Sequence, residues 1–162
     1  MEAPDAQSIT VKIQLLNTSE PMAFSPGGGF ILVSRGFVRL MENEAELAFV
    51  LGHEMAHYIL HHAPEVDRAH LNIDRQRELE LEADSLAVRL VSEAGYDPRA
   101  GALALLRAHD AAKRYGMDGA HPAVELRIRV LQDTLTEESL YALGVLDRRD
   151  FQSFKAALLS KP

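Results

Sequence analysis

Residues 46–57 read ELAFVLGHEMAH, an apolar run that ends in an HExxH motif. The run predicts a buried helix, on which residues four apart share a face because each residue turns the helix by about 100°. His53 and His57 can therefore direct two imidazole nitrogens at one metal ion. Glu54 lies one position along, within reach of a water molecule at that ion but not placed as a third ligand. This is the arrangement that a zinc hydrolase requires, and it needs a third ligand from elsewhere in the chain.

The composition narrows the classes of protein and partner. The chain has 162 residues, of which 47% are hydrophobic and 25% charged, enough for one domain with a hydrophobic core. A net charge of −7 without a basic cluster argues against nucleic acid or anionic lipid as the main partner. The absence of cysteine excludes disulfides and thiolate metal sites. No apolar run approaches the roughly 20 residues that span a bilayer, and the acidic start is not a signal peptide.

The predicted elements form a short N-terminal sheet followed mostly by helices, which is an α+β class. Residues 1–8 are predicted to be a loose polar tail, and the alternation over residues 9–15 predicts a strand. The motif helix is predicted over about 44–62 with Asn43 as its N-cap. Residues 65–78 are either a loop or the first half of the next helix. Later helices are predicted near residues 79–94, 98–115, 122–131, 137–143 and 148–159, the last two with Thr136 and Asp147 as caps.

A glycine triplet, Gly27–Gly29, precedes a second predicted strand over residues 30–34. The triplet favours a tight turn and a plain hairpin, and it also leaves room for another backbone to approach. An exposed strand here could accept an extended peptide by edge pairing, as proteases often hold their substrates. The candidate substrate-binding residues are Gly29, Phe30, Ile31, Leu32 and Val33.

A third metal ligand is available on the helix after the motif helix. Glu80 and Asp84 are four residues apart and share a face, whereas Glu82 points about 200° away from Glu80. Glu80 would complete a two-histidine, one-carboxylate site, and Asp84 would accept a hydrogen bond from the outer nitrogen of His53. The alternative is that these acids form a solvated face with no metal.

With Glu80 and Asp84 in place, the sequence resembles the gluzincin metallopeptidase family of the CAAX prenyl endopeptidase, HtpX and BepA, which pairs HExxH with a downstream ExxxD. The resemblance extends to residues 22–33, to residues 95–98 and to His121-Pro122. One departure is Met22, where relatives commonly have asparagine. The resemblance implies a mainly helical zincin-like metallopeptidase domain over residues 1–162, one Zn²⁺ per chain and polypeptide substrates.

Two further residues near the expected site have open roles. The resemblance places the loop of His121 near the metal, where His121 could stabilise the oxyanion, occupy the fourth metal position or make only a local hydrogen bond. Arg127 could orient the site or stabilise charge, or it could form a structural ion pair. Surface exposure is expected for His61. His62 cannot serve as the third histidine of the metzincin pattern, which needs glycine and histidine at positions that hold leucine and alanine.

The sequence therefore predicts a zinc endopeptidase in which Glu54 is the general base. The alternatives are a latent protease that acts as a binding or chaperone-like module, and a helical domain without metal. The resemblance further suggests a role in quality control or processing in the cell envelope, with membrane or envelope proteins as partners and an anchor outside this chain.

Overall fold

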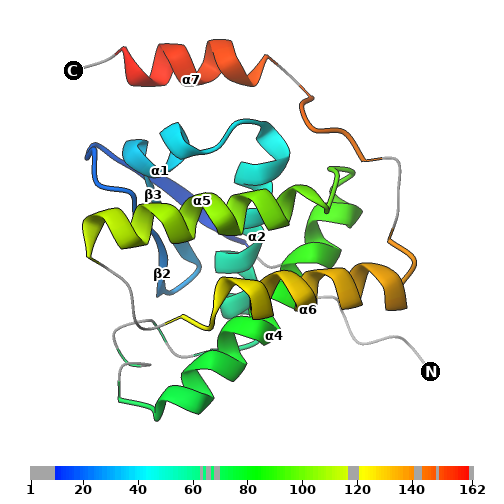
Figure 1. Cartoon of the computed structure of the whole chain (residues 1–162). Coiled ribbons are helices and arrows are strands. Elements are labelled where there is room, and N and C mark those ends of the chain that lie inside the picture. The colour runs from blue at the N-terminus through cyan, green and yellow to red at the C-terminus, as the bar shows by residue number, and fades with distance from the viewer. Residues whose placement is uncertain are drawn as a thin grey trace.

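The computed structural model describes residues 10–62, 64, 67, 70–116, 121–140, 144–148 and 150–160, with three strands first and helices after them (Figure 1). The elements are β1 (Lys12–Leu16), β2 (Ala23–Gly27), β3 (Phe30–Ser34), α1 (Arg35–Leu40), α2 (Glu44–Ile59), α4 (Ile73–Glu93), α5 (Ala100–Tyr115), α6 (Val124–Glu137) and α7 (Phe151–Leu159). The predicted α+β class, mainly helical with a small N-terminal sheet, is confirmed. The tail predicted over residues 1–8 lies outside the described residues. Within the described part, no helix combines the length and apolar character needed to cross a bilayer.

The sheet places β3 in the middle, in the order β1-β3-β2. β1 pairs with β3 in parallel and β2 pairs with it antiparallel, so both edges of β3 are occupied. The carbonyl of Gly29 is used as well, because it accepts from Lys12 N at 2.8 Å. The expectation that residues 29–33 offer a free edge to a substrate is therefore wrong. In the described part of the chain, the outer strands are β1 and β2.

The motif helix α2 is at the centre of the molecule, packed against α4, α5 and the sheet (Figure 1). Two side chains satisfy backbone donors at its start, where a helix leaves N–H groups without intrahelical partners. Asn43 accepts from Glu46 N at 2.9 Å, which confirms the predicted N-cap. Asp147 accepts from Glu44 N at 2.7 Å. The Asp147 bond places the start of α2 against a segment a hundred residues later in the chain.

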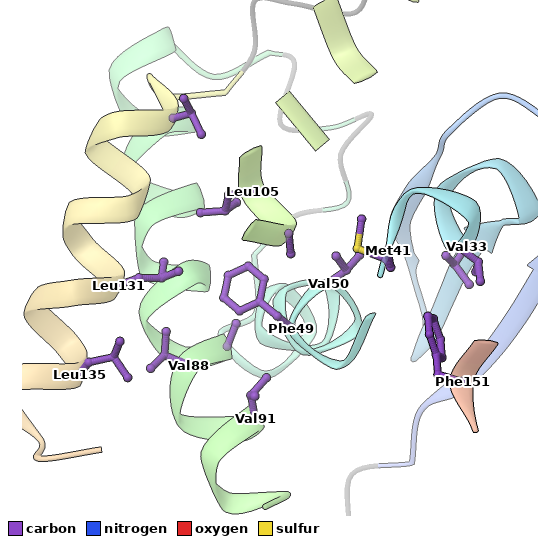
Figure 2. Close-up of a cluster of buried hydrophobic side chains, with 14 residues drawn as sticks. Val33, Met41, Phe49, Val50, Val88, Val91, Leu105, Leu131, Leu135 and Phe151 are labelled. Carbon is purple, nitrogen blue, oxygen red and sulfur yellow. The ribbon is translucent and has the colours of Figure 1, made fainter. Parts of the chain in front are cut away.

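The core forms where α4, α5 and α6 close over α2. Figure 2 shows the ring of Phe49 between side chains from these helices, including Val88, Leu105 and Leu131. Gly101 permits the close approach of α5, since a Cβ there would lie 2.6 Å from Phe49 Cδ2. The packing holds α2 and α4 side by side along their length, which sets the geometry between their polar faces.

The C-terminal part differs from the sequence-based expectation. Thr136 lies inside α6, where its hydroxyl donates to the Gln132 carbonyl at 2.8 Å, so it does not cap a helix over residues 137–143. Residues 141–143 are outside the described part. The last helix, α7, is capped by Asp150, which accepts from Ser153 N at 2.9 Å. Asp147, the predicted cap, instead accepts from Glu44 N at the start of α2.

Candidate metal centre and active site

Three buried side chains converge between α2 and α4. His53 and His57 come from α2, Glu80 comes from α4, and their candidate ligand atoms all lie within 4.8 Å of one another. The two Nε2 atoms are 3.2 Å apart. His53 Nε2 is 3.3 Å from Glu80 Oε2, and His57 Nε2 is 3.3 Å from Glu80 Oε1. The structure therefore brings together the three residues that the sequence spacing predicts as metal ligands.

The outer nitrogen of His53 is held by a carboxylate. His53 Nδ1 is 3.0 Å from Asp84 Oδ1, as the sequence predicted for the second partner of this histidine. Asp84 is in turn clamped by Arg127, whose Nε and one terminal nitrogen each donate to it at 2.7 Å. Arg127 thus lies behind Asp84, in the ion pair that was one of its two expected roles, and its nearest Glu80 oxygen is 3.9 Å away.

The electrostatics of the cluster favour a cation. Burial alone would lower the pKa of His53, but hydrogen bonds to Asp84 and Glu80 outweigh burial and raise that pKa to about 10. Burial alone would raise the pKa of Glu80, yet hydrogen bonds from His121, His53 and His57 hold it well below its usual range. Burial alone would raise the pKa of Asp84, but the charge and hydrogen bonds of Arg127 outweigh burial and lower that pKa. Both carboxylates are therefore ionised and the site attracts positive charge.

Zinc fits this donor set. Two imidazole nitrogens and one carboxylate are the protein ligands of many catalytic zinc sites, which leave a fourth position for water or substrate. Both histidines present Nε2 to the common point because their Nδ1 atoms are engaged elsewhere. The two carboxylates that raise the pKa of His53 would equally favour a bound cation at its Nε2. His53, His57 and Glu80 are accordingly the residues that would hold the ion.

His57 has an outer partner that the sequence analysis did not find. Its Nδ1 lies 2.9 Å from His62 Nδ1, and His62 Nε2 lies 3.1 Å from Glu82 Oε2. The motif helix ends at Ile59, earlier than predicted, and the chain then turns back through His61. The metzincin pattern concerns direct metal ligands, so it does not predict a role for His62 as a partner of His57. Spacing within a helix gave no signal for a contact made after the helix ends.

A cavity of about 550 Å³ adjoins the cluster. Glu54 and His121 lie on its wall next to His53, and Arg127 contributes to the same wall. The rest of the lining is mostly apolar and comes from residues 21–26, α2, α5 and the start of α6. His121 also contacts the cluster directly, since its Nδ1 is 2.9 Å from Glu80 Oε2. None of the residues expected to bind substrate, Gly29 to Val33, lines this cavity.

Comparison with known proteins agrees with the geometry. The model of peptidase family M48 matches residues 2–69, and that of peptidase U49 matches residues 45–145, more than half of the chain. A curated relative, the mitochondrial metalloendopeptidase OMA1 of Schizosaccharomyces pombe, is 28% identical over 159 residues, covering 78% of this chain and 47% of the relative. The Arabidopsis thaliana protein of the same name is 28% identical over 114 residues, which cover 53% of this chain and 24% of the length of the relative.

The chain thus spans less than half the length of these curated relatives. Both family models include the HExxH motif, and they overlap over residues 45–69. Residues 2–69 are similar to peptidase family M48, a gluzincin metallopeptidase family, and both curated relatives are metalloendopeptidases. Because the peptidase U49 model matches more than half of the chain, this chain belongs to peptidase family U49.

Proposed function

We propose that this chain is the catalytic domain of a zinc-dependent endopeptidase that hydrolyses peptide bonds in protein substrates. The observation that carries the proposal is the convergence of His53, His57 and Glu80 at the wall of a cavity that Glu54 also lines. A metal site buried away from any cavity would be structural. A site with a carboxylate beside it and about 550 Å³ of space in front can receive a substrate.

Zinc bound at this site would supply a Lewis acid and would let water act as a nucleophile near neutral pH. Glu54 is the group placed to take the proton of the attacking water and to pass it to the leaving amine. Arg127 and Asp84 act one layer further out, by holding His53 in the tautomer that presents Nε2 inward. His121 is the cavity-wall group that can donate to the developing oxyanion.

The substrate backbone is proposed to lie along β2. Residues 21–26 line the cavity, and β2 has β3 on only one side among the described elements. Ser34 N donates to Met22 O at 2.8 Å, so the next pair, Ala23 and Val33, is a non-hydrogen-bonded pair. The N–H and C=O of Ala23 are then directed away from β3, and Ala23 itself lines the cavity. An extended peptide can pair with them, and its side chains would meet the apolar wall of α5.

The test of the proposal is the substitution Glu54→Gln, which keeps the shape of the side chain and removes its basicity. The expected result is full zinc content and a rate of casein cleavage lowered by about 10²–10⁴-fold, the usual contribution of a general base. Glu93→Gln, an exposed substitution at the end of α4, is the matched control and should cleave normally. Unchanged cleavage by the Glu54→Gln variant, or a purified chain without stoichiometric zinc, would contradict the proposal.

The contact between His121 and Glu80 favours a second candidate, a latent form in which His121 competes for the fourth metal position. Such a chain would bind unfolded proteins without cleaving them until His121 moves away. His121→Ala separates the two functions. The variant should cleave faster than the natural chain if His121 blocks the site, and more slowly if His121 stabilises the oxyanion.

The setting of the enzyme is proposed from its relatives. Two of them are named mitochondrial metalloendopeptidases, and the family resemblance suggests a membrane-associated or envelope protease. We infer that this chain works at a membrane on membrane or envelope proteins, in processing or quality control. Fractionation of cells that produce the protein tests this placement, and recovery of the protein only in the soluble fraction would argue against it.

A further inference from the structure

The outer face of His57 is occupied by a chain of three side chains. His57 Nδ1 meets His62 Nδ1 at 2.9 Å, and His62 Nε2 meets Glu82 Oε2 at 3.1 Å. The other oxygen of Glu82 accepts from Arg75 at 3.1 Å. The His62 side chain is only 4% exposed, whereas that of Glu82 is 47% exposed. The chain therefore runs from the buried centre to the surface of α4.

The positions of the protons along this chain follow from chemistry. A histidine that binds a metal through Nε2 keeps its proton on Nδ1, so His57 is the donor in its contact with His62. His62 Nδ1 must then be a bare acceptor, which places the His62 proton on Nε2. That proton points to the Glu82 carboxylate, an acceptor only. Both imidazole N–H groups then have an acceptor, and Glu82 selects the tautomer of His62 whose Nδ1 can accept the hydrogen bond from His57.

The end of α2 is folded so that this contact forms. His62 N donates to His57 O at 2.9 Å, and His61 N donates to Tyr58 O at 3.2 Å, the pair of bonds of a Schellman motif. The motif needs a left-handed residue at its turn, and His61 supplies it with φ of 54° although it is not glycine. A strained residue persists only where its surroundings hold it. Here the turn returns the chain so that the His62 ring stacks edgewise on the His57 ring, with centroids 5.1 Å apart.

We propose that His62 is a positioning residue for the metal ligand His57, and that Glu82 acts through it by fixing its tautomer. The arrangement parallels the Asp84–Arg127 pair behind His53. Behind His53 the acceptor is a buried carboxylate, whereas behind His57 the acceptor is the neutral imidazole of His62, whose own partner Glu82 is exposed to solvent. The inference rests on the proposed metal site, and its predicted effect is on the affinity of that site for zinc, because outer partners orient metal-ligating histidines.

The test measures zinc affinity of the purified chain by competition with a chromophoric chelator. His62→Leu removes the acceptor and should weaken zinc binding by about 10–100-fold. His62→Asn should retain most of the affinity, because its Oδ1 can occupy the place of Nδ1 and accept from His57. The control His61→Gly removes the neighbouring imidazole and favours the left-handed turn, so it should leave the affinity unchanged.

The role of Glu82 is tested by the same substitution in two proteins, the natural chain and the His62→Asn variant. Glu82→Ala should weaken zinc binding by about 10-fold in the natural chain, near the lower end of the same range, and should have no effect in the His62→Asn variant. Glu78→Ala is the matched control, since Glu78 also binds Arg75 on the surface of α4, at 2.9 Å, without touching His62. A loss that persists in the His62→Asn background would mean that Glu82 acts only by its charge and would overturn its role.

The outcomes separate this inference from the proposed function. A natural chain that binds no zinc contradicts the metal site itself. Tight zinc binding by the natural chain and equally tight binding by a folded His62→Leu variant overturns only the positioning role. Cobalt substitution gives a second readout, because a reoriented His57 changes the visible absorption of the bound Co²⁺. Identical cobalt spectra for His62→Leu and the natural chain would likewise contradict the inference.

Discussion

Arg127→Met tests the ion pair behind the metal site. The substitution keeps an unbranched apolar stem and removes both 2.7 Å hydrogen bonds to Asp84. Asp84 is 0% exposed, so its carboxylate would stay in the interior without its main counter-charge. Breaking a buried pair by removing one partner typically costs about 3–5 kcal/mol.

The structure places the expected cost at the lower end of that range. His53 Nδ1 remains 3.0 Å from Asp84 Oδ1, and in the metal-free chain the raised pKa of His53 keeps this imidazole protonated at neutral pH. Asp84 therefore retains one charged partner after Arg127 is lost. We expect the free energy of unfolding to fall by about 3 kcal/mol, which corresponds to a melting temperature lower by about 6–12 °C for a chain of this size.

The assay is urea denaturation of the metal-stripped protein, because zinc bound to the native state would add stability and mask the loss. The double variant Asp84→Asn with Arg127→Met removes both charges and should recover most of the lost free energy of unfolding. Replacing both members of a buried ion pair costs far less than removing one, which leaves the other charge buried without a partner. A loss below about 1 kcal/mol in the single variant would refute the reasoning. So would a double variant no more stable than the single one.

Three further predictions concern the core, pH dependence and substrate binding. Gly101→Ala should lower the free energy of unfolding by about 1–3 kcal/mol in urea titrations, because its Cβ would lie 2.6 Å from Phe49 Cδ2. Gly52→Ala, whose Cβ would meet nothing closer than 3.6 Å, is the matched control, and an equal loss there would contradict the steric explanation. The folded-state pKa of His53, about 10, lies above its unfolded value of 6.5, so the stabilisation is complete below pH 6.5 and is lost as the pH rises toward 10. Urea midpoints of the metal-stripped chain should therefore fall between pH 7 and 10, and a flat profile would speak against the raised pKa. Ala23→Pro removes a backbone N–H that faces away from β3 at a residue lining the cavity, so it should lower kcat/KM for an unfolded protein without changing zinc affinity. Unchanged cleavage would argue against substrate pairing with β2.

The spacing of residues within single helices was read correctly from the sequence. The pairs His53 and His57, and Glu80 and Asp84, share a face because residues four apart on a helix always do. Asn43 caps α2 for an equally local reason, since its side chain reaches a backbone N–H three residues on. These features depend on backbone geometry over one turn, which the sequence specifies wherever the helix forms.

The order of the strands was not available from the sequence. The alternation in β1 and the apolar run of β3 predict strands, but neither pattern states which strand is central. The sheet pairs β1 with β3 across residues 17–29, and β2 takes the edge beside the cavity. Composition alone therefore predicts β3 as the edge that receives the substrate, whereas in the structure β3 is paired on both sides.

The sequence by itself thus determined which side chains stand together on α2 and on α4, because helical periodicity links positions one turn apart. Only the tertiary structure decided what lies behind each ligand. Arg127 reaches Asp84 from α6, and His62 reaches His57 after a left-handed turn, over contacts that no periodicity encodes. Those contacts depend on how α4 and α6 pack against α2 and on where α2 ends. The physical reason is that local backbone geometry repeats, whereas packing between elements distant in sequence is set by the shapes of all the side chains between them.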